Sequence, residues 1–357
     1  MIETNLDCEI SIFMPVYNGG RYLKESIESV LSQTFRDFEL VCVDDSSTDD
    51  SFGILKAYSE FDSRVRVFQK SNGGIVPVSW NFVLPLLRGK SNTYMSQDDL
   101  MSEDNLECMF NRQIETGADC VLPDMVWYYE GKTDNKFIVG VNGDRSKIIT
   151  NREAVVLSLQ WQIHGFGLWK ASIFKNRTFR EDAFDSDELF IRESFLLCNK
   201  VAFCKGMFYY RRDNGQSITQ TFDLKNYYSV LTRFRIYKLL ERNGFDESTL
   251  NFGFITVVFF IFLNYRYSWL RRKELASEEM TGVRKMFYDT YRRLDIKRVL
   301  NCAFQEKGFK RLKYIMVFMV FVNYRVFQGC MFLVYIYDRL RLSVGVYNVD
   351  SNSGLKW

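Results

Sequence analysis

The stretch Asn92-Thr93-Tyr94-Met95-Ser96-Gln97-Asp98-Asp99 decides how the rest of the chain is interpreted. Its residues 93–95 have the β-branched and apolar character of the end of a buried strand. Two adjacent aspartates follow where a parallel strand would stop, and residues 102–105 have the acidic first turn of a helix. In an open α/β sheet, ligands bind outside the carboxyl ends of the strands. The stretch therefore predicts an acidic ligand-binding turn at the edge of a sheet.

The pair Asp98-Asp99 allows two interpretations on its own. Adjacent carboxylates repel each other unless a cation or hydrogen-bond donors share the site. A divalent ion with oxygen ligands, holding a diphosphate, would remove this repulsion. Two solvated turn carboxylates before a helix are the simpler alternative, because a helix N-terminus favours negative charge. The rest of the chain decides between the two.

Composition limits the classes of protein to consider. The 357 residues exceed one typical domain and predict two, and the apolar fraction of 47% excludes wholesale disorder. A net charge of +3 gives no argument for nucleic acid as a partner. Aromatic residues make up 16% of the chain, which indicates extended apolar surface or contact with a membrane.

Cysteine and histidine usage argues against disulfides and against a zinc site. The eight cysteines are scattered, without Cys-x-x-Cys, which favours reduced thiols in a cytosolic compartment. The only histidine is His164, and a structural role is favoured for it over a catalytic one. The first residues lack a basic segment followed by an apolar one, so we expect no signal peptide.

The first hundred residues alternate between strand and helix patterns. Apolar runs at residues 10–18, 38–43 and 65–68 predict buried strands, and apolar residues at helical spacing lie between them. This alternation predicts a parallel sheet covered on both faces. The pairs Asp44-Asp45 and Asp98-Asp99 each follow a strand, so both should open onto the crevice at the carboxyl ends.

Several short motifs occur in a fixed order over roughly the first hundred residues. They are Met14-Pro15-Val16-Tyr17-Asn18, Ser32-Gln33-Thr34-Phe35, Phe38-Glu39-Leu40, Val43-Asp44-Asp45-Ser46-Ser47-Thr48-Asp49, Asn72-Gly73-Gly74 and Ser96-Gln97-Asp98-Asp99. Together they resemble the family 2 glycosyltransferases with the GT-A fold. The resemblance implies an α/β nucleotide-diphospho-sugar transferase fold, with a Rossmann-like, mostly parallel sheet. The later residues predict a C-terminal, mainly α-helical extension. The GT-A domain is expected over residues 1–222, with a nucleotide-sugar-binding half at 1–105, an acceptor-binding half at 106–222 and the helical region at 223–357.

The resemblance also implies which residues bind the donor. Nucleotide-sugar binding is expected at Pro15, Tyr17, Asn18, Asp44, Asp45, Asn72, Gly73, Asp98 and Arg211. Asp98 and Asp99 would hold a Mg²⁺ or Mn²⁺ ion that bridges the sugar diphosphate. The metal motif of the family is usually Asp-x-Asp, and Ser96 stands here in place of its first Asp, so one contact to the ion would pass through water.

The general base is expected before an apolar helix in the second half of the chain. The family usually has Glu-Asp-x-x-Phe there, and the Asp is similar in role to a general base. Spacing to Phe190 gives that role to Asp187, with Glu188 as the second choice, and Ser186 replaces the usual Glu. An ordinary acidic helix N-terminus is the alternative.

Two further segments have open interpretations. Residues 209–219 resemble the closing motif of the family, in which Arg211 or Arg212 would pair with the diphosphate, although a surface salt bridge would explain them equally. Residues 161–169 are aromatic with two glycines, which suits either a sugar ring or a strand and turn in the core. Residues 128–150 are polar and predict a hairpin or loop over the site.

The region after residue 223 has a different composition, and the resemblance ends there. Residues 252–265 and 313–337 are apolar and aromatic, with basic residues beside them. Asn323, Arg325 and Gln328 interrupt the second run and argue against a simple transmembrane span. Helices that lie on anionic lipid at the inner face of the cell membrane are favoured. A packed helical bundle or a homodimer interface is the alternative.

These observations predict a non-processive, inverting glycosyltransferase in polysaccharide biosynthesis. It would move one sugar from a nucleoside diphosphate donor, a UDP-sugar for preference, to a carbohydrate or lipid-linked oligosaccharide acceptor. A processive synthase is disfavoured because Gln-x-x-Arg-Trp is absent from the sequence. The alternatives are a transferase-like binding or assembly protein at the membrane, suggested by Ser96 and Ser186, and a nucleotidyltransferase, which would release diphosphate.

Overall fold

The computed structural model describes residues 8–130, 137–138, 140–215, 224–271, 276–305 and 307–343. The chain divides into two compact units. The first comprises Met1–Glu181 and Ser186–Gln216, and the second comprises Asp182–Asp185 and Ser217–Trp357. The domain boundary expected between residues 222 and 223 lies outside the described residues, as do parts of the predicted loop at 128–150 and of the closing motif at 209–219.

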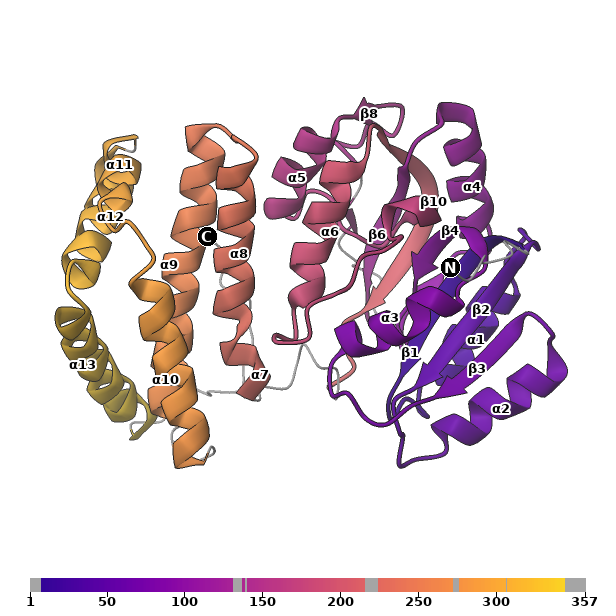
Figure 1. Cartoon of the computed structure of the whole chain (residues 1–357), viewed down its shortest axis with the longest axis horizontal. Helices are drawn as coiled ribbons and strands as arrows, with labels where there is room; N and C mark the ends of the chain where they lie inside the picture. Colours follow the sequence, from indigo (N-terminus) through magenta and orange to yellow (C-terminus); the bar gives the residue numbers. More distant parts are fainter. Residues whose placement is uncertain are drawn as a thin grey trace. The chain divides into compact units, whose positions relative to one another are not determined.

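The first unit is built on one mixed sheet with the strand order β3-β2-β1-β4-β9-β6-β10-β5 (Figure 1). The strands β1 and β2, β1 and β4, β2 and β3, and β6 and β10 pair in parallel. The short strand β9 pairs antiparallel with both β4 and β6 and thereby joins the two parallel parts. The bounds are β1 Cys8–Val16, β2 Phe38–Asp44, β3 Val65–Gln69, β4 Gly89–Tyr94, β5 Leu100–Met101, β6 Cys120–Tyr128, β7 Phe137–Ile138, β8 Ile148–Ile149, β9 Leu168–Lys170 and β10 Val201–Arg211.

Helices of the first unit cover both faces of this sheet, as the alternating pattern predicted. Along β1, Ile10, Ile12 and Met14 belong to the main core cluster together with apolar residues of α1. Phe13, between them, points to the other face, where its ring lies 4.6 Å from Trp80 of α3. The helices are α1 Leu23–Leu31, α2 Ser51–Phe61, α3 Val76–Val83, α4 Asn105–Thr116, α5 Asn151–Leu159 and α6 Ser186–Leu197, with 3₁₀ turns at Leu84–Leu86 and Ala171–Ile173.

The second unit is helical, as the change of composition predicted. Its helices α8 and α9 lie side by side (Figure 1), and its core is largely aromatic, with Phe254, Phe287 and Phe327 fully buried. Arg266 of α9 donates two hydrogen bonds, of 2.7 and 2.8 Å, to the carboxylate of Asp338 in α13. The helices are α7 Leu224–Tyr227, α8 Ser229–Arg242, α9 Glu247–Leu270, α10 Ser277–Tyr291, α11 Arg298–Gln305, α12 Gly308–Phe321 and α13 Tyr324–Ser343.

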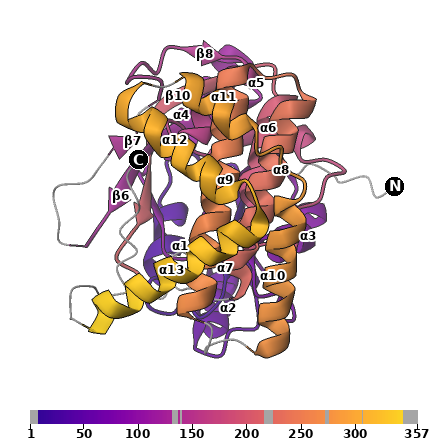
Figure 2. The same cartoon turned by 90° about the vertical axis from the view of Figure 1, so that its left-hand side faces the viewer.

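Only α9, among the helices of the described ranges, has by itself the length and apolar composition of a membrane span. However, 56% of its apolar window is buried inside the chain, as in a core helix. The segments Tyr314–Phe321 and Tyr324–Asp338 meet the same criterion only as a pair, and they are bent by 113° at their junction (Figure 2).

All eight cysteines are free thiols. Five of them are buried, namely Cys42, Cys120, Cys198, Cys204 and Cys302. Removal from water raises the pKa of the Cys204 thiol to about 12 and that of Cys302 to about 11, because the thiolate is disfavoured there. The buried thiols are therefore protonated and unreactive in the native state.

Candidate active site at the carboxyl ends of the strands

The acidic turn after β4 is buried. Asp98 and Asp99 are 8% and 1% exposed. The side chain of Asn214 donates to Asp98 Oδ2 over 2.7 Å, and the backbone amide of Arg211 donates to Asp99 Oδ1 over 2.9 Å. No described protein group donates to Asp99 Oδ2. Burial, and next the negative charge of Asp98, raise the pKa of Asp99 well above its usual range.

A buried carboxylate oxygen without a donor has the chemistry that a hard cation requires. Asp98 and Asp99 therefore fit a divalent ion. Within the part of the chain that the structure describes, no group of three or more His, Cys, Asp or Glu side chains could hold a metal. At most two carboxylates would thus bind the ion here, and phosphate oxygens or water would supply the other ligands, as is common for Mg²⁺.

The second acidic turn, after β2, makes mostly internal contacts. The carboxylate of Asp44 is buried and accepts hydrogen bonds from the Ser47 amide at 3.2 Å and the Gln69 side chain at 3.0 Å. Asp45 accepts the Gly73 amide over 2.8 Å and the Gly74 amide over 3.3 Å, and it pairs with Lys70. Its carboxylate therefore fixes the loop that contains Asn72 and Gly73.

The turn that follows β1 presents an aromatic ring to solvent. Pro15 is buried within β1, whereas Tyr17, two residues further on, is 46% exposed. Asn18 has a left-handed backbone with φ of 49°, and its side-chain oxygen accepts the Thr48 amide over 2.8 Å. This contact connects the turn after β1 to the acidic turn after β2.

The first turn of α6 contains the two candidate bases in different surroundings. Glu188 forms an ion pair with the buried Arg192, one helical turn further on. Asp187 is half-buried. Burial, and next the negative charges of Asp99, Asp187 and Asp98, raise the pKa of Tyr94. The three aspartates thus lie within electrostatic range of one phenol, at the end of β4.

Tyr94 belongs to an aromatic wall beside the acidic turn. Its ring stacks on Trp80 at 5.7 Å and lies 5.9 Å from both Phe13 and Phe166. Of the tryptophans considered for sugar contacts, Trp169 is 2% exposed and packs on Phe195, so it belongs to the core. Trp161 is 54% exposed.

Arg211 is buried at the end of β10 rather than open to solvent. Its Nε donates to the Asp98 carbonyl at 2.8 Å, and its Nη2 donates to Glu25 at 2.7 Å. The guanidinium also lies over the rings of Tyr22 and Tyr128, at 4.3 and 4.8 Å. Arg211 therefore stabilises the acidic turn twice, because its side chain donates to the Asp98 carbonyl and its backbone amide donates to the Asp99 carboxylate.

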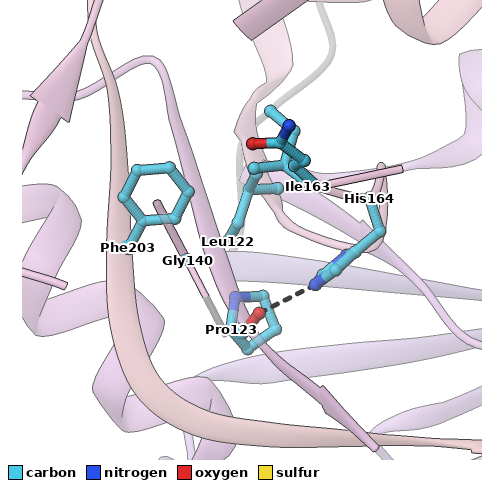
Figure 3. A pocket seen from close by; sticks show the side chains of 7 residues that line it. Leu122, Pro123, Gly140, Ile163, His164 and Phe203 are labelled. Carbon is cyan, nitrogen blue, oxygen red and sulfur yellow. Dashed lines mark hydrogen bonds between the residues drawn. The ribbon is translucent and has the colours of Figure 1, made fainter. Parts of the chain in front are cut away.

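His164 lies in a structural environment. One ring nitrogen, Nε2, is 2.8 Å from the carbonyl of Pro123, and the other accepts the Phe166 amide over 3.2 Å (Figure 3). Because Nδ1 is an acceptor, the proton lies on Nε2. Burial lowers the pKa of His164 to about 4, so the ring is neutral near pH 7. The small hollow beside it, lined by residues such as Leu122 and Phe203, has no room for a ligand.

Known proteins have sequences similar to this chain. Residues 11–177 match the family described as glycosyl transferase family 2. Over this stretch the chain is similar to the family 2 glycosyltransferases. The glycosyltransferase GlyG of Streptococcus pneumoniae is 28% identical to it over 304 residues, which cover 80% of this chain and 97% of GlyG. The minor teichoic acid biosynthesis protein GgaB of Bacillus subtilis is 30% identical over 164 residues, which cover 42% of this chain and 18% of GgaB.

A solved structure confirms the GT-A fold of this transferase. Residues 1–349 of TarS from S. aureus, in complex with UDP-GlcNAc, superpose with a TM-score of 0.60 at 18% identity. The match covers 90% of this chain and 92% of that structure. The expected mostly parallel sheet and helical C-terminal region are therefore confirmed.

Three site residues of the transferase were missed from the sequence. Tyr94 ends the strand before the acidic turn, Gln97 lies in the turn and accepts the Tyr17 amide, and Asn214 donates to Asp98. Asn214 lies 116 residues after Asp98 in the sequence, and no local pattern places it beside that aspartate. The sequence signal that could have marked Tyr94 was its position as an aromatic residue at the end of the strand before the acidic turn.

Proposed function

We propose that this chain is an inverting glycosyltransferase that moves a single sugar from a nucleoside diphosphate sugar to a carbohydrate or lipid-linked oligosaccharide acceptor. The observation that supports the proposal best is the buried Asp98-Asp99 pair, in which one carboxylate oxygen, Oδ2 of Asp99, accepts no hydrogen bond from a described protein group. A UDP-sugar is the first donor to test, because the TarS structure of the same fold contains UDP-GlcNAc. The likeness to GgaB, whose name refers to teichoic acid biosynthesis, supports the proposal of a polysaccharide acceptor.

The donor would bind along the carboxyl ends of β1, β2 and β4. Asp98 and Asp99 would hold a Mg²⁺ or Mn²⁺ ion, which neutralises charge on the leaving diphosphate when bound. The exposed ring of Tyr17 suits the face of the nucleotide base. The remaining residues proposed to surround the nucleotide sugar are Pro15, Asn18, Asp44, Asp45, Asn72, Gly73 and Arg211.

Asp187 is proposed as the general base. The acceptor oxygen forms a bond to the anomeric carbon while the bond from that carbon to the diphosphate oxygen breaks. The acceptor proton passes to the Asp187 carboxylate, and a single displacement of this kind inverts the anomeric centre. Glu188 is the weaker candidate, because its carboxylate already forms an ion pair with Arg192.

We also propose attachment to the cytoplasmic face of an anionic membrane. The helices α12 and α13 expose apolar side chains, among them Met316, Met319 and Leu333, at 55%, 54% and 66%. The basic residues Lys307, Arg311 and Arg325 are exposed on the same helices or directly before them. Exposed apolar and basic side chains together suit anionic lipid better than a neutral apolar partner.

The function can be tested by incubating the protein with a panel of UDP-sugars and a lipid-linked acceptor, with and without Mn²⁺. We expect UDP to be released and the acceptor to gain one sugar with the opposite anomeric configuration. Release of inorganic diphosphate would instead identify a nucleotidyltransferase. Donor binding without any turnover, across the whole panel, would indicate a binding or assembly protein.

A further inference from the structure

The side chain of Gln97 connects two parts of the proposed donor site. The Tyr17 amide donates to Gln97 Oε1 over 2.8 Å, and Gln97 Nε2 donates to the Tyr17 carbonyl over 2.9 Å. These two hydrogen bonds, which we call the Gln97 bridge, satisfy both backbone groups of Tyr17 as a neighbouring strand would. The Gln97 carbonyl in turn accepts the hydroxyl of Ser26 in α1, over 2.9 Å.

The turn held by the Gln97 bridge is fixed on its other side by the segment after β2. The Asn18 amide donates to Ser47 Oγ over 3.0 Å, and the Gly20 amide donates to Asp49 Oδ2 over 3.1 Å. Without Gln97, the turn would keep these contacts to one neighbour and lose its connection to the acidic turn. The bridge is therefore the direct link between the backbone of Tyr17 and the residue that precedes Asp98.

Gly19 leaves the space that the Gln97 amide occupies. A Cβ atom at Gly19 would lie 2.6 Å from Cδ of Gln97, which is closer than real Cβ atoms approach. The atoms in conflict are the far end of a flexible side chain, so a methyl group here would displace the amide and not the backbone. Gly19 thus offers a second, independent way to break the bridge.

We propose that Gln97 is a positioning residue that sets the distance between the Tyr17 ring and the Asp98-Asp99 pair. This inference rests on the proposed function, in which the base of the donor lies at Tyr17 and its diphosphate at the acidic pair. The two ends of one ligand must then bind at a fixed separation. A rigid connection between the two turns lowers the entropy lost when the donor binds.

The primary test compares Gln97→Met with Gln113→Met. Methionine keeps the length of the side chain and removes the amide. Gln113 is a matched control, because it is buried in α4 and accepts the hydroxyl of Ser91 over 2.7 Å, away from both turns. We expect Gln97→Met to weaken UDP binding roughly tenfold and to raise the donor KM more than it lowers kcat, as the loss of two neutral hydrogen bonds suggests. Gln113→Met should lower Tm by about as much as Gln97→Met does, but it should leave the affinity for UDP unchanged.

Two double variants distinguish a role of Gln97 in positioning Tyr17 from a general loss of stability in the variant protein. If Gln97 acts through the Tyr17 ring, Gln97→Met should have little further effect on UDP binding in a Tyr17→Ala background. Gly19→Ala alone should reproduce the loss of affinity, and Gly19→Ala with Gln97→Ala should be no worse than Gln97→Ala. Additive losses in both pairs would overturn the proposal.

The failures of the two proposals can be told apart. If the wild-type protein binds neither UDP nor another nucleoside diphosphate in calorimetry, the proposed function is wrong. If the wild type binds UDP and a folded Gln97→Met variant binds it equally well, the function stands and the role assigned to Gln97 is wrong. Calorimetry with UDP alone needs no acceptor and no turnover.

Discussion

The backbone amide of Arg211 donates to Asp99 Oδ1 over 2.9 Å, although 112 residues separate the two in sequence. In the sheet, β9 and β6 lie between the strand that precedes Asp99 and the strand that ends at Arg211. The acidic turn is therefore stabilised by both halves of the first unit. Its other donor, Asn214, comes from the same segment as Arg211.

The Asp99→Asn variant should lose Mn²⁺-dependent donor binding and keep its fold. The raised pKa of Asp99 indicates that its charge is disfavoured in the empty protein, so removing the charge should not lower the free energy of unfolding. Calorimetry with a UDP-sugar, with and without Mn²⁺, measures the binding, and urea denaturation measures the stability.

Asp119→Asn is the matched control for that variant. Asp119 accepts the Asn199 amide over 2.7 Å and pairs with Lys170 over 2.9 Å, and these contacts lower its pKa although burial opposes them. We expect this variant to lose about 1–3 kcal/mol of stability and to keep its response to Mn²⁺. Equal metal dependence in Asp99→Asn and the wild type would rule out the metal site.

Asp187→Asn should lower the transfer rate by about 10²–10⁴-fold, the usual contribution of general base catalysis. Donor affinity should change little, because the donor is proposed to bind residues of the first hundred. Glu188→Gln should affect the rate less and should reduce stability, since it removes the negative charge from the ion pair with the buried Arg192. A normal rate in Asp187→Asn with a large loss in Glu188→Gln would transfer the role of the base to Glu188.

The free energy of unfolding should decrease as the pH is lowered from about 6.5 to about 4, because of His164. In the unfolded chain this histidine binds a proton below its ordinary pKa of about 6.5, whereas in the folded chain burial lowers the pKa to about 4. The unfolded state therefore binds more protons over this interval, and roughly 3 kcal/mol is lost as the pH falls through it. Above pH 6.5 both states are neutral and the contribution is constant.

This effect can be isolated because the chain has one histidine. The difference in unfolding free energy between the wild type and His164→Gln should shrink as the pH is lowered from 7.5 to 4.5, in urea titrations at each pH. A difference independent of pH would contradict the neutral, buried state of the ring.

The double variant Met316→Asp/Met319→Asp should release the protein from vesicles that contain anionic lipid. Each exposed methionine would contribute roughly 1–2 kcal/mol by insertion, so vesicle binding should drop at least about tenfold in flotation. Ile114→Asp is a control of the same kind on α4, where Ile114 is 68% exposed. Unchanged flotation of the double variant would favour a role of this surface in contacts between copies of the chain.

The parallel part of the sheet could be predicted from the sequence because its central strands, β1 and β2, are buried on both faces. Such strands give continuous apolar runs, and β2, with seven buried residues, is the clearest of them. The acidic turn after β2 was predictable for the same reason, since Asp44 is the last residue of that strand. The strand before Asp98-Asp99, Gly89–Tyr94, is largely polar, and that turn was predicted from its motif.

The joining strand β9 and the long-range donors could not be predicted in the same way. A strand of three residues, Leu168–Lys170, is too short to show a period. The partners of Asp98 and Tyr17 are Asn214 and Gln97, and each pair is joined by side-chain amides across long sequence separations. Amide side chains occur in many turns, so their presence indicates a turn and not a partner.

The buried thiols provide a probe of local opening in each of the two units. Cys42, Cys120, Cys198 and Cys204 lie in the first unit and Cys302 lies in the second. A thiol that is protected in the native state reacts with a labelling reagent only when its surroundings open, so the labelling rate at each sulfur measures the local opening equilibrium. Mass spectrometry of partly labelled protein would then show whether the sheet and the helical unit open together or one before the other, without any substitution in the chain.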